Sequence, residues 1–143
     1  MFKCVIGDST TVPMYCGTGT AVTDGALVTY DVSTGAAVSP VIDGTASLLA
    51  ENVAGVVVGT PGASDTTCNV IPIRGQVWEA DCTSTPTTAM LGKVNDLTDS
   101  TTVANSTTIS TANTGFIRTL TISDATNKKM HVFILGGQDA VAN

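Results

Sequence analysis

The chain has 143 residues, a formal charge of −6 and only 4% aromatic residues. Charged residues make up 13% against a usual ~25%, and the abundance of Thr, Ser, Ala, Gly and Val is typical of β-proteins with uncharged polar surfaces. Six scattered Lys and Arg residues provide no basic stripe for a row of phosphates, and no segment reaches the ~18 apolar residues of a membrane span. Nucleic-acid and membrane partners are therefore not expected.

The first 14 residues, MFKCVIGDSTTVPM, contain a short apolar stretch with Phe2, Val5 and Ile6. The stretch is too short for a signal-peptide core, so we expect a soluble protein made in a cytoplasm. It has two interpretations: an extended arm that adds a strand to the exposed sheet edge of another protein, or the first strand of the domain itself. Residues 15–143 are expected to form a single β domain.

Turn signals at short intervals, each flanked by β-branched residues, predict an all-β fold. We expect a compact β-barrel or sandwich with antiparallel hairpins and short helical turns. The predicted strands are residues 26–32, 36–41, 53–58, 67–73, 76–81, 115–122 and 129–135. Two short helices are candidates, at residues 45–52 and 88–97.

The run VAGVVVG, residues 53–59, is apolar throughout. A strand of this kind is covered on both faces, either inside a sandwich or barrel or at a subunit contact. Val56 and Val58 are therefore candidates for the core or for a contact between subunits.

Two polar segments are expected to lack regular core structure. TSTPTT, residues 83–88, is interpreted as a linker, although the 55 residues after it are few for a separate domain. Residues 98–114 are a low-complexity tract rich in Thr, Ser and Asn, interpreted as a long exposed loop or an edge hairpin.

The densest cluster of distinctive residues lies in VIPIRGQVWEADCT, residues 70–83. Trp78 is the single Trp of the chain and is expected in the core or as an anchor at an interface. Arg74, beside Gly75, is expected to reach a carboxylate on a neighbouring strand or subunit. The cluster therefore indicates structure rather than catalysis.

The sequence contains no recognisable catalytic or cofactor-binding motif. His131, the single His, lies in an alternating strand and is expected at the surface. Glu79 and Asp81 share a strand face two residues apart, which fits a solvated polar face better than a cation site. GTGTAV, residues 17–22, lacks the third Gly of a dinucleotide loop. We expect no enzymatic activity, no cofactor, no metal and no small-molecule substrate.

The four cysteines show neither a zinc pattern nor a dense disulfide framework, since they lie 12, 52 and 14 residues apart. They are expected to be buried thiols, and a disulfide would be possible in an oxidised environment. The residues are Cys4, Cys16, Cys68 and Cys82.

Three segments resemble the small β-barrel decoration, or cement, proteins of tailed-phage heads. They are GALVTYDVSTGAAVSP and the residues after it to Gly44, VAGVVVG, and VIPIRGQVWE, which together cover about a quarter of the chain; AMLGKV adds to the resemblance. The shared features are spacings of Gly and Val.

This resemblance implies a virion protein that binds the major capsid protein on the outer surface of an assembled, expanded head. It implies a homotrimer at three-fold and quasi-three-fold positions, and an N-terminal arm that pairs with capsid loops. Phe2, Val5 and Ile6 are the candidate contact residues of that arm. The alternatives are another phage structural component, such as a coat, tail or fibre module, and a β-module of a cell-surface adhesin.

Overall fold

Short strands with frequent turns produce an all-β protein of two sheets packed together, as the composition and turn spacing predict. The computed structural model describes residues 1–17, 22–30, 35–38, 53–105 and 117–135. In this part of the chain the elements are β1 (Phe2–Ile6), β2 (Val12–Tyr15), β3 (Leu27–Tyr30), β4 (Ala37–Val38), β5 (Val53–Val58), β6 (Thr67–Pro72), β7 (Val77–Cys82), the 3-10 helix η2 (Thr88–Met90), β8 (Val94–Asp99), β9 (Thr102–Ala104), β10 (Ile117–Asp124) and β11 (Lys129–Ile134).

The first sheet has the strand order β1-β7-β11-β10-β8-β9, and its neighbours are antiparallel. β9 also pairs in parallel with the end of β7, where Asp81 lies opposite Thr102 and Cys82 opposite Val103. The strands β7, β11, β10, β8 and β9 therefore close into a ring. On the edge of β7 that faces β9, the residues before Asp81 pair with β1 instead.

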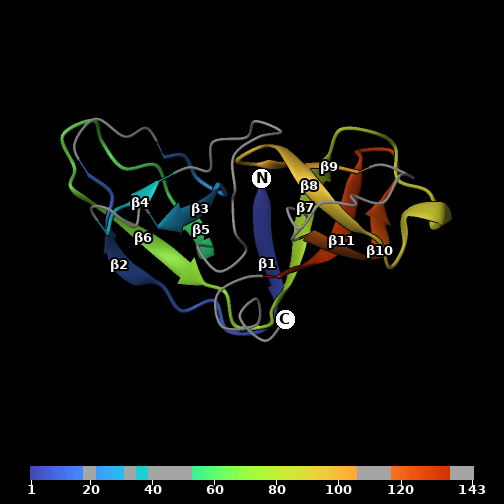
Figure 1. The fold of residues 1–143 in the computed structure, drawn as a ribbon, viewed down its shortest axis with the longest axis horizontal. Helices are drawn as coiled ribbons and strands as arrows, with labels where there is room; N and C mark the ends of the chain where they lie inside the picture. Colours follow the sequence, from blue (N-terminus) through green and yellow to red (C-terminus); the bar gives the residue numbers. More distant parts are fainter. Residues whose placement is uncertain (18–21, 31–34, 39–52, 106–116, 136–143) are drawn as a thin grey trace.

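The second sheet has the order β2-β6-β5-β3-β4 and is antiparallel throughout. Figure 1 shows the two sheets side by side, with β1 between them. Every strand of the second sheet comes from residues 12–72, and every strand of the first from residues 2–6 and 77–134.

β5 has both faces covered, which confirms the expectation from its continuous apolar run. Its pairing with β3 shifts register by one residue, because Leu27 lies opposite Val56 but Thr29 lies opposite Val53. This bulge places Val53 and Val56 in one core cluster and their neighbours Ala54 and Val57 in another. Val58, at the end of the strand, is exposed.

Gly55 sits within this bulge and is required there by close packing. A Cβ atom on Gly55 would lie 2.1 Å from the carbonyl oxygen of Ile71 and 2.7 Å from a methyl carbon of Val70. No side chain fits such distances, so glycine allows β5 and β6 to approach each other.

The core has two parts of different character. The larger fills the space between the sheets and the inside of the first sheet, and contains Phe2, Leu27, Val53, Val56, Ile71, Trp78, Ala80, Cys82, Met90, Leu97, Val103, Ile117, Met130, Val132 and Ile134. The smaller lies on the other face of the second sheet and contains Cys16, Val22, Val28, Ala37, Ala54, Val57, Cys68 and Val70.

The N-terminal residues are a strand of the first sheet and not an extended arm. β1 pairs with β7 from Phe2 to Ile6, and the side chain of Phe2 is buried in the larger core. The N–H of Phe2 donates to the carbonyl of Gly25 at 2.9 Å, and the N–H of Leu27 donates to the carbonyl of Ser100 at 2.7 Å. These two hydrogen bonds join the sheets, so β1 is part of the junction between them.

The predicted helix at residues 88–97 is wrong. A 3-10 turn occupies Thr88–Met90, and β8 begins at Val94. Gly92 lies between them with φ +76, a left-handed conformation that ends any helix there. The other helix candidate, residues 45–52, lies outside the described residues.

Described parts of both polar segments belong to or contact the first sheet. Of the low-complexity tract, residues 98–105 complete β8, turn, and form β9, so this part is a hairpin; residues 106–114 lie outside the description. The segment 83–88 follows β7 and leads through η2 to β8, which belongs to the same sheet. Thr83 at its start donates its N–H to the carbonyl of Val103 in β9 at 3.0 Å. The segment does not separate two domains.

Candidate functional site

Trp78 is a core residue. Its side chain is fully buried between the sheets, in the cluster that also contains Phe2 and Met130. The indole Nε1 has no hydrogen-bond partner among the described residues. Trp78 therefore acts through its apolar area, and it is not available as an exposed anchor for a partner.

Arg74 binds a carboxylate of a neighbouring segment, that of Asp8, with Nη1 to Oδ2 at 3.0 Å. The buried Gln76 lies beside this ion pair and donates Nε2–H to the carbonyls of Asp8 and Pro72, both at 2.8 Å, while its Oε1 accepts from the N–H of Arg74. Hydrogen bonds from Thr10 hold the pKa of Asp8 below its usual value, with a smaller contribution from Arg74. These contacts fasten the chain after β1 to the β6–β7 turn.

Charged residues form two rows across the outer face of the first sheet. In one row Glu79 lies between Lys3 and His131 on the adjacent strands, and in the next Asp81 lies opposite Lys129. Lys129 Nζ is 3.1 Å from Asp81 and 3.6 Å from Glu79.

Asp81 also accepts a hydrogen bond from the N-terminal amine of Met1 at 2.7 Å. Burial tends to raise the pKa of Asp81, but hydrogen bonds from this amine and from Lys129 outweigh it and hold the pKa below its usual value. The hydrogen bond with Asp81 raises the pKa of Lys129. Glu79, Asp81 and His131 thus share a partly exposed strand face whose acids are paired with cations.

An apolar row crosses the same outer face at its other end. Register places five side chains next to one another across β1, β7, β11, β10 and β8: Ile6, Val77, Phe133, Arg118 and Val94. Ile6 is 64% exposed, and the Arg118 guanidinium donates to the carbonyl of Gly92 at 2.9 Å. We call these five residues the apolar row. Val77, Phe133 and Val94 are half-buried, so Ile6 and Arg118 are the exposed members of the row.

The second sheet also has an exposed face, beyond the area that the first sheet covers. Cross-strand pairing places Pro13, Asn69 and Val58 in one line and Tyr15 next to Thr67 in the adjoining line. Tyr15 is 49% exposed and Val58 45%. We call these five residues the β2–β6–β5 face.

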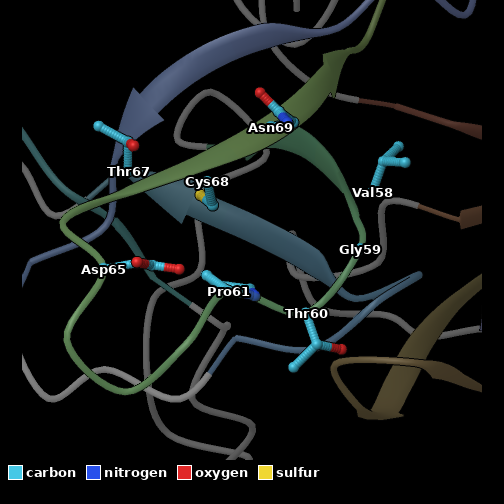
Figure 2. A pocket seen from close by; sticks show the side chains of 8 residues that line it. All are labelled: Val58, Gly59, Thr60, Pro61, Asp65, Thr67, Cys68 and Asn69. Carbon is cyan, nitrogen blue, oxygen red and sulfur yellow. The ribbon is translucent and has the colours of Figure 1, made fainter.

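A shallow depression of about 230 Å³ lies at the loop end of the β5–β6 hairpin. Asp65 lines it and accepts a hydrogen bond from the N–H of Gly62 at 2.7 Å. Figure 2 shows Thr67 and Asn69 projecting from β6 away from Asp65 and Pro61. Since the polar groups do not converge, we assign no ligand to this depression.

Two buried polar residues have structural roles that the sequence did not reveal. Asn105 appears in the sequence only within an Asn-Ser-Thr glycosylation pattern, yet its buried amide donates to the carbonyl of Ser84 and accepts from the N–H of Ser84, both at 2.9 Å. Thr119, also buried, donates its hydroxyl to the carbonyl of Met90. The buried role of Thr119 could have been predicted from its polar side chain at a core position of an alternating strand.

All four cysteines are free thiols in the structure, and only Cys4 is less than fully buried. Cys16 and Cys68 lie together in the smaller core, and Cys82 lies in the larger. Burial raises the pKa of both Cys68 and Cys82 to about 11. Thiols with such values are protonated at neutral pH and poor nucleophiles.

The described ranges contain no helix long and apolar enough to cross a membrane, and no group of three or more His, Cys, Asp or Glu side chains placed to hold a metal ion. No protein-family model matches the chain, and no curated protein matches its sequence significantly.

Proposed function

We propose that this chain is a structural, non-enzymatic protein of a tailed-phage virion, which binds the outside of the expanded capsid as a homotrimer. The observation that carries the proposal is the exposure of Val5 (40%) and Ile6 (64%) on an edge strand. An edge strand with exposed apolar side chains suits addition to a sheet of another protein, here the major capsid protein.

The backbone of β1 supports this mode of binding. The N–H of Phe2 points away from β7, since it donates to Gly25. Polar backbone groups alternate in direction along an antiparallel strand, so those of Cys4 also point away from β7. The edge of β1 that a capsid strand would join therefore lies next to the exposed side chains of Val5 and Ile6, whereas Phe2 belongs to the core.

Such a protein acts by mass action and not by turnover. A ligand that binds only the expanded lattice stabilises that lattice in proportion to its occupancy. Three linked copies engage neighbouring capsomers together, so weak contacts add up to firm attachment. A surface rich in Thr and Ser with few charges leaves few ions to be desolvated at each contact.

The test is a double substitution, Val5→Lys with Ile6→Lys, in the full chain. We expect the variant to remain folded, because both side chains are exposed, and to lose co-sedimentation with expanded heads of the parent virus. Deletion of residues 1–12 is a poorer test, because it removes Phe2 from the core. Leu91→Lys, at an exposed apolar residue outside β1, is the matched control and should bind normally.

Normal capsid binding by the double variant would overturn the role of β1. Absence of the protein from purified virions by mass spectrometry would overturn the proposed function as a whole. Detection on cell surfaces instead would favour an adhesin module.

A further inference from the structure

Two of the four cysteines are neighbours across a pair of strands in the second sheet. β2 pairs with β6 so that Tyr15 lies opposite Thr67. The pairing continues one residue beyond β2, because the N–H of Cys16 donates to the carbonyl of Thr66 at 2.9 Å. Cys16 and Cys68 are therefore diagonal neighbours on two hydrogen-bonded strands.

Both cysteine side chains point to the same side of the sheet. Tyr15 and Thr67 belong to the β2–β6–β5 face, and successive side chains of a strand point to opposite faces. The cysteines that follow them face the smaller core, where Cys16 is 1% exposed and Cys68 5%. Figure 2 shows Cys68 on the side of β6 that faces Asp65, and the Cys16 thiol donates to the carbonyl of Asp65 at 3.7 Å. Both sulfur atoms thus lie on the Asp65 side of the sheet.

The two thiols are also in direct contact. Burial is the main cause of the raised pKa of Cys68, and the Cys16 thiol contributes further, in part through a hydrogen bond between the two side chains. A disulfide needs a closer approach, with the sulfur atoms about 2.05 Å apart. In the described part of the chain β2 is an edge strand that pairs only with β6, so a small shift of β2 can supply this approach.

The other two cysteines are not placed to form a disulfide with each other. Cys4 lies opposite Trp78 in the first sheet, and Cys82 lies four positions further along β7. A strand rises about 3.3 Å per residue, so their Cα atoms are at least roughly 13 Å apart, whereas a disulfide requires less than about 7 Å. Both pack in the larger core, away from the cysteines of the smaller core.

We propose that Cys16 and Cys68 form a disulfide when the folded protein meets a small dialkyl disulfide as oxidant. Cys68 is the point of entry, because it lines the depression at the loop end of the β5–β6 hairpin. Its thiolate attacks one sulfur atom of the oxidant, whose S–S bond breaks and releases one thiol. The Cys16 thiolate then attacks the Cys68 sulfur and releases the second thiol. The two cysteines lose two electrons and two protons, and the oxidant becomes two thiols.

The bond would tie the edge strand β2 to β6 across 52 positions of the chain. A cross-link that closes a long loop restricts the unfolded chain strongly, so it should stabilise the second sheet. On the proposed virion exterior the bond forms after release from the reducing cytoplasm. The chemistry itself does not depend on the proposed function.

The experiment treats the folded full chain with 2-hydroxyethyl disulfide at about pH 8.5, where more thiol is ionised than at neutral pH. The remaining thiols are alkylated in denaturant, and the protein is cleaved before Asp, which separates Cys16, in residues 8–23, from Cys68, in residues 65–80. Mass spectrometry should find these two peptides joined, with the loss of two hydrogen atoms. The oxidised protein should unfold at least about 5 °C above the reduced protein, and dithiothreitol should reverse both changes.

Matched variants separate this pair from the other thiols. The double variant Cys4→Ser with Cys82→Ala retains only the pair and should give the same joined peptides and the same rise in unfolding temperature. Cys68→Ala leaves Cys16 without its partner and should give neither. Cys16→Ala provides a second variant of the pair if Cys68→Ala fails to fold.

Three results would overturn the proposal. They are a treated protein in which Cys16 and Cys68 remain open to alkylation, one in which either is joined to another cysteine, and one in which the bond forms only after urea is added. An oxidised protein no more stable than the reduced one would overturn the stabilising role of the bond. Capsid binding is measured separately, so failure of the disulfide leaves the proposed function standing, and absence from virions leaves the disulfide standing.

Discussion

The two sheets are built from similar short strands but bury different side chains. The core inside and beneath the first sheet contains Trp78, Phe2, Met130 and other large residues, whereas the smaller cluster on the second sheet contains, among the described residues, only Val, Ala and Cys. Since stabilisation follows the apolar area removed from water, the described part of the first core contributes more stability than that of the second. The second sheet is held largely through the four residues that it contributes to the larger core, Leu27, Val53, Val56 and Ile71.

The largest expected effect is that of Trp78→Ala, which should lower the free energy of unfolding by about 3–5 kcal/mol through lost burial and a new cavity. Urea titration followed by circular dichroism measures it. Trp78→Phe should cost less, because a ring remains and Nε1 has no hydrogen bond to lose among the described residues. Emission of the wild-type indole at the wavelength of free Trp in water would contradict the burial on which this prediction depends.

Matched substitutions in the two cores sharpen the comparison. Val132→Ala in the larger core and Val57→Ala in the smaller remove the same two methyl groups from fully buried sites. Each should cost about 2 kcal/mol in the same urea titration. We expect a single transition in both variants, since four residues of the second sheet belong to the larger core. A separate early transition for Val57→Ala alone would show that the second sheet unfolds independently.

A further expected effect, absent at neutral pH, is a loss of stability at alkaline pH. The pKa of Cys68 and that of Cys82 are raised by burial from 9.0 to about 11. Above pH 9 the unfolded thiols ionise while the folded ones stay protonated, so stability should be full below pH 9 and fall as pH rises toward 11. Unfolding midpoints between pH 8 and about 11 measure this slope, and Cys68→Ala and Cys82→Ala should each reduce it. An unchanged slope in both variants would rule the thiols out as its cause.

The fold class and most strands were predictable because their patterns are local. The expected strand at 53–58 coincides with β5, and those at 67–73, 76–81 and 129–135 differ from β6, β7 and β11 by at most one residue at either end. The expected strand at 115–122 overlaps β10, which continues to Asp124, while residues 115 and 116 lie outside the described residues. β2 was missed because Pro13 within it reads as a turn residue, although proline is tolerated on an edge strand. β8 was missed because the polar Asn95 occupies one of its buried positions.

The candidate surfaces were only partly predictable. Ile6 was expected to be exposed because it was a candidate contact residue, and it is 64% exposed. The apolar row depends on register across five strands, and no local sequence pattern specifies register between strands so far apart. Phe2 resembled Val5 and Ile6 in the sequence, and only its pairing opposite Ala80 sets its side chain in the core. The hydrogen bond from Gln76 to the carbonyl of Asp8 could not be predicted, because the two residues are 68 positions apart in the sequence.

The position of β7 has a consequence for how fast the protein folds. Its partners β1, β9 and β11 come from both ends and the later middle of the chain, so its pairings join residues separated by tens of positions. Each such pairing requires closure of a long loop, and the entropy of closure is lost before the stabilising contacts form. Folds dominated by pairings of this kind form in milliseconds to seconds rather than microseconds. Until β7 has paired with these strands, its unpaired edge can pair with another partly folded chain. The yield of native protein should therefore fall as the protein concentration during refolding rises.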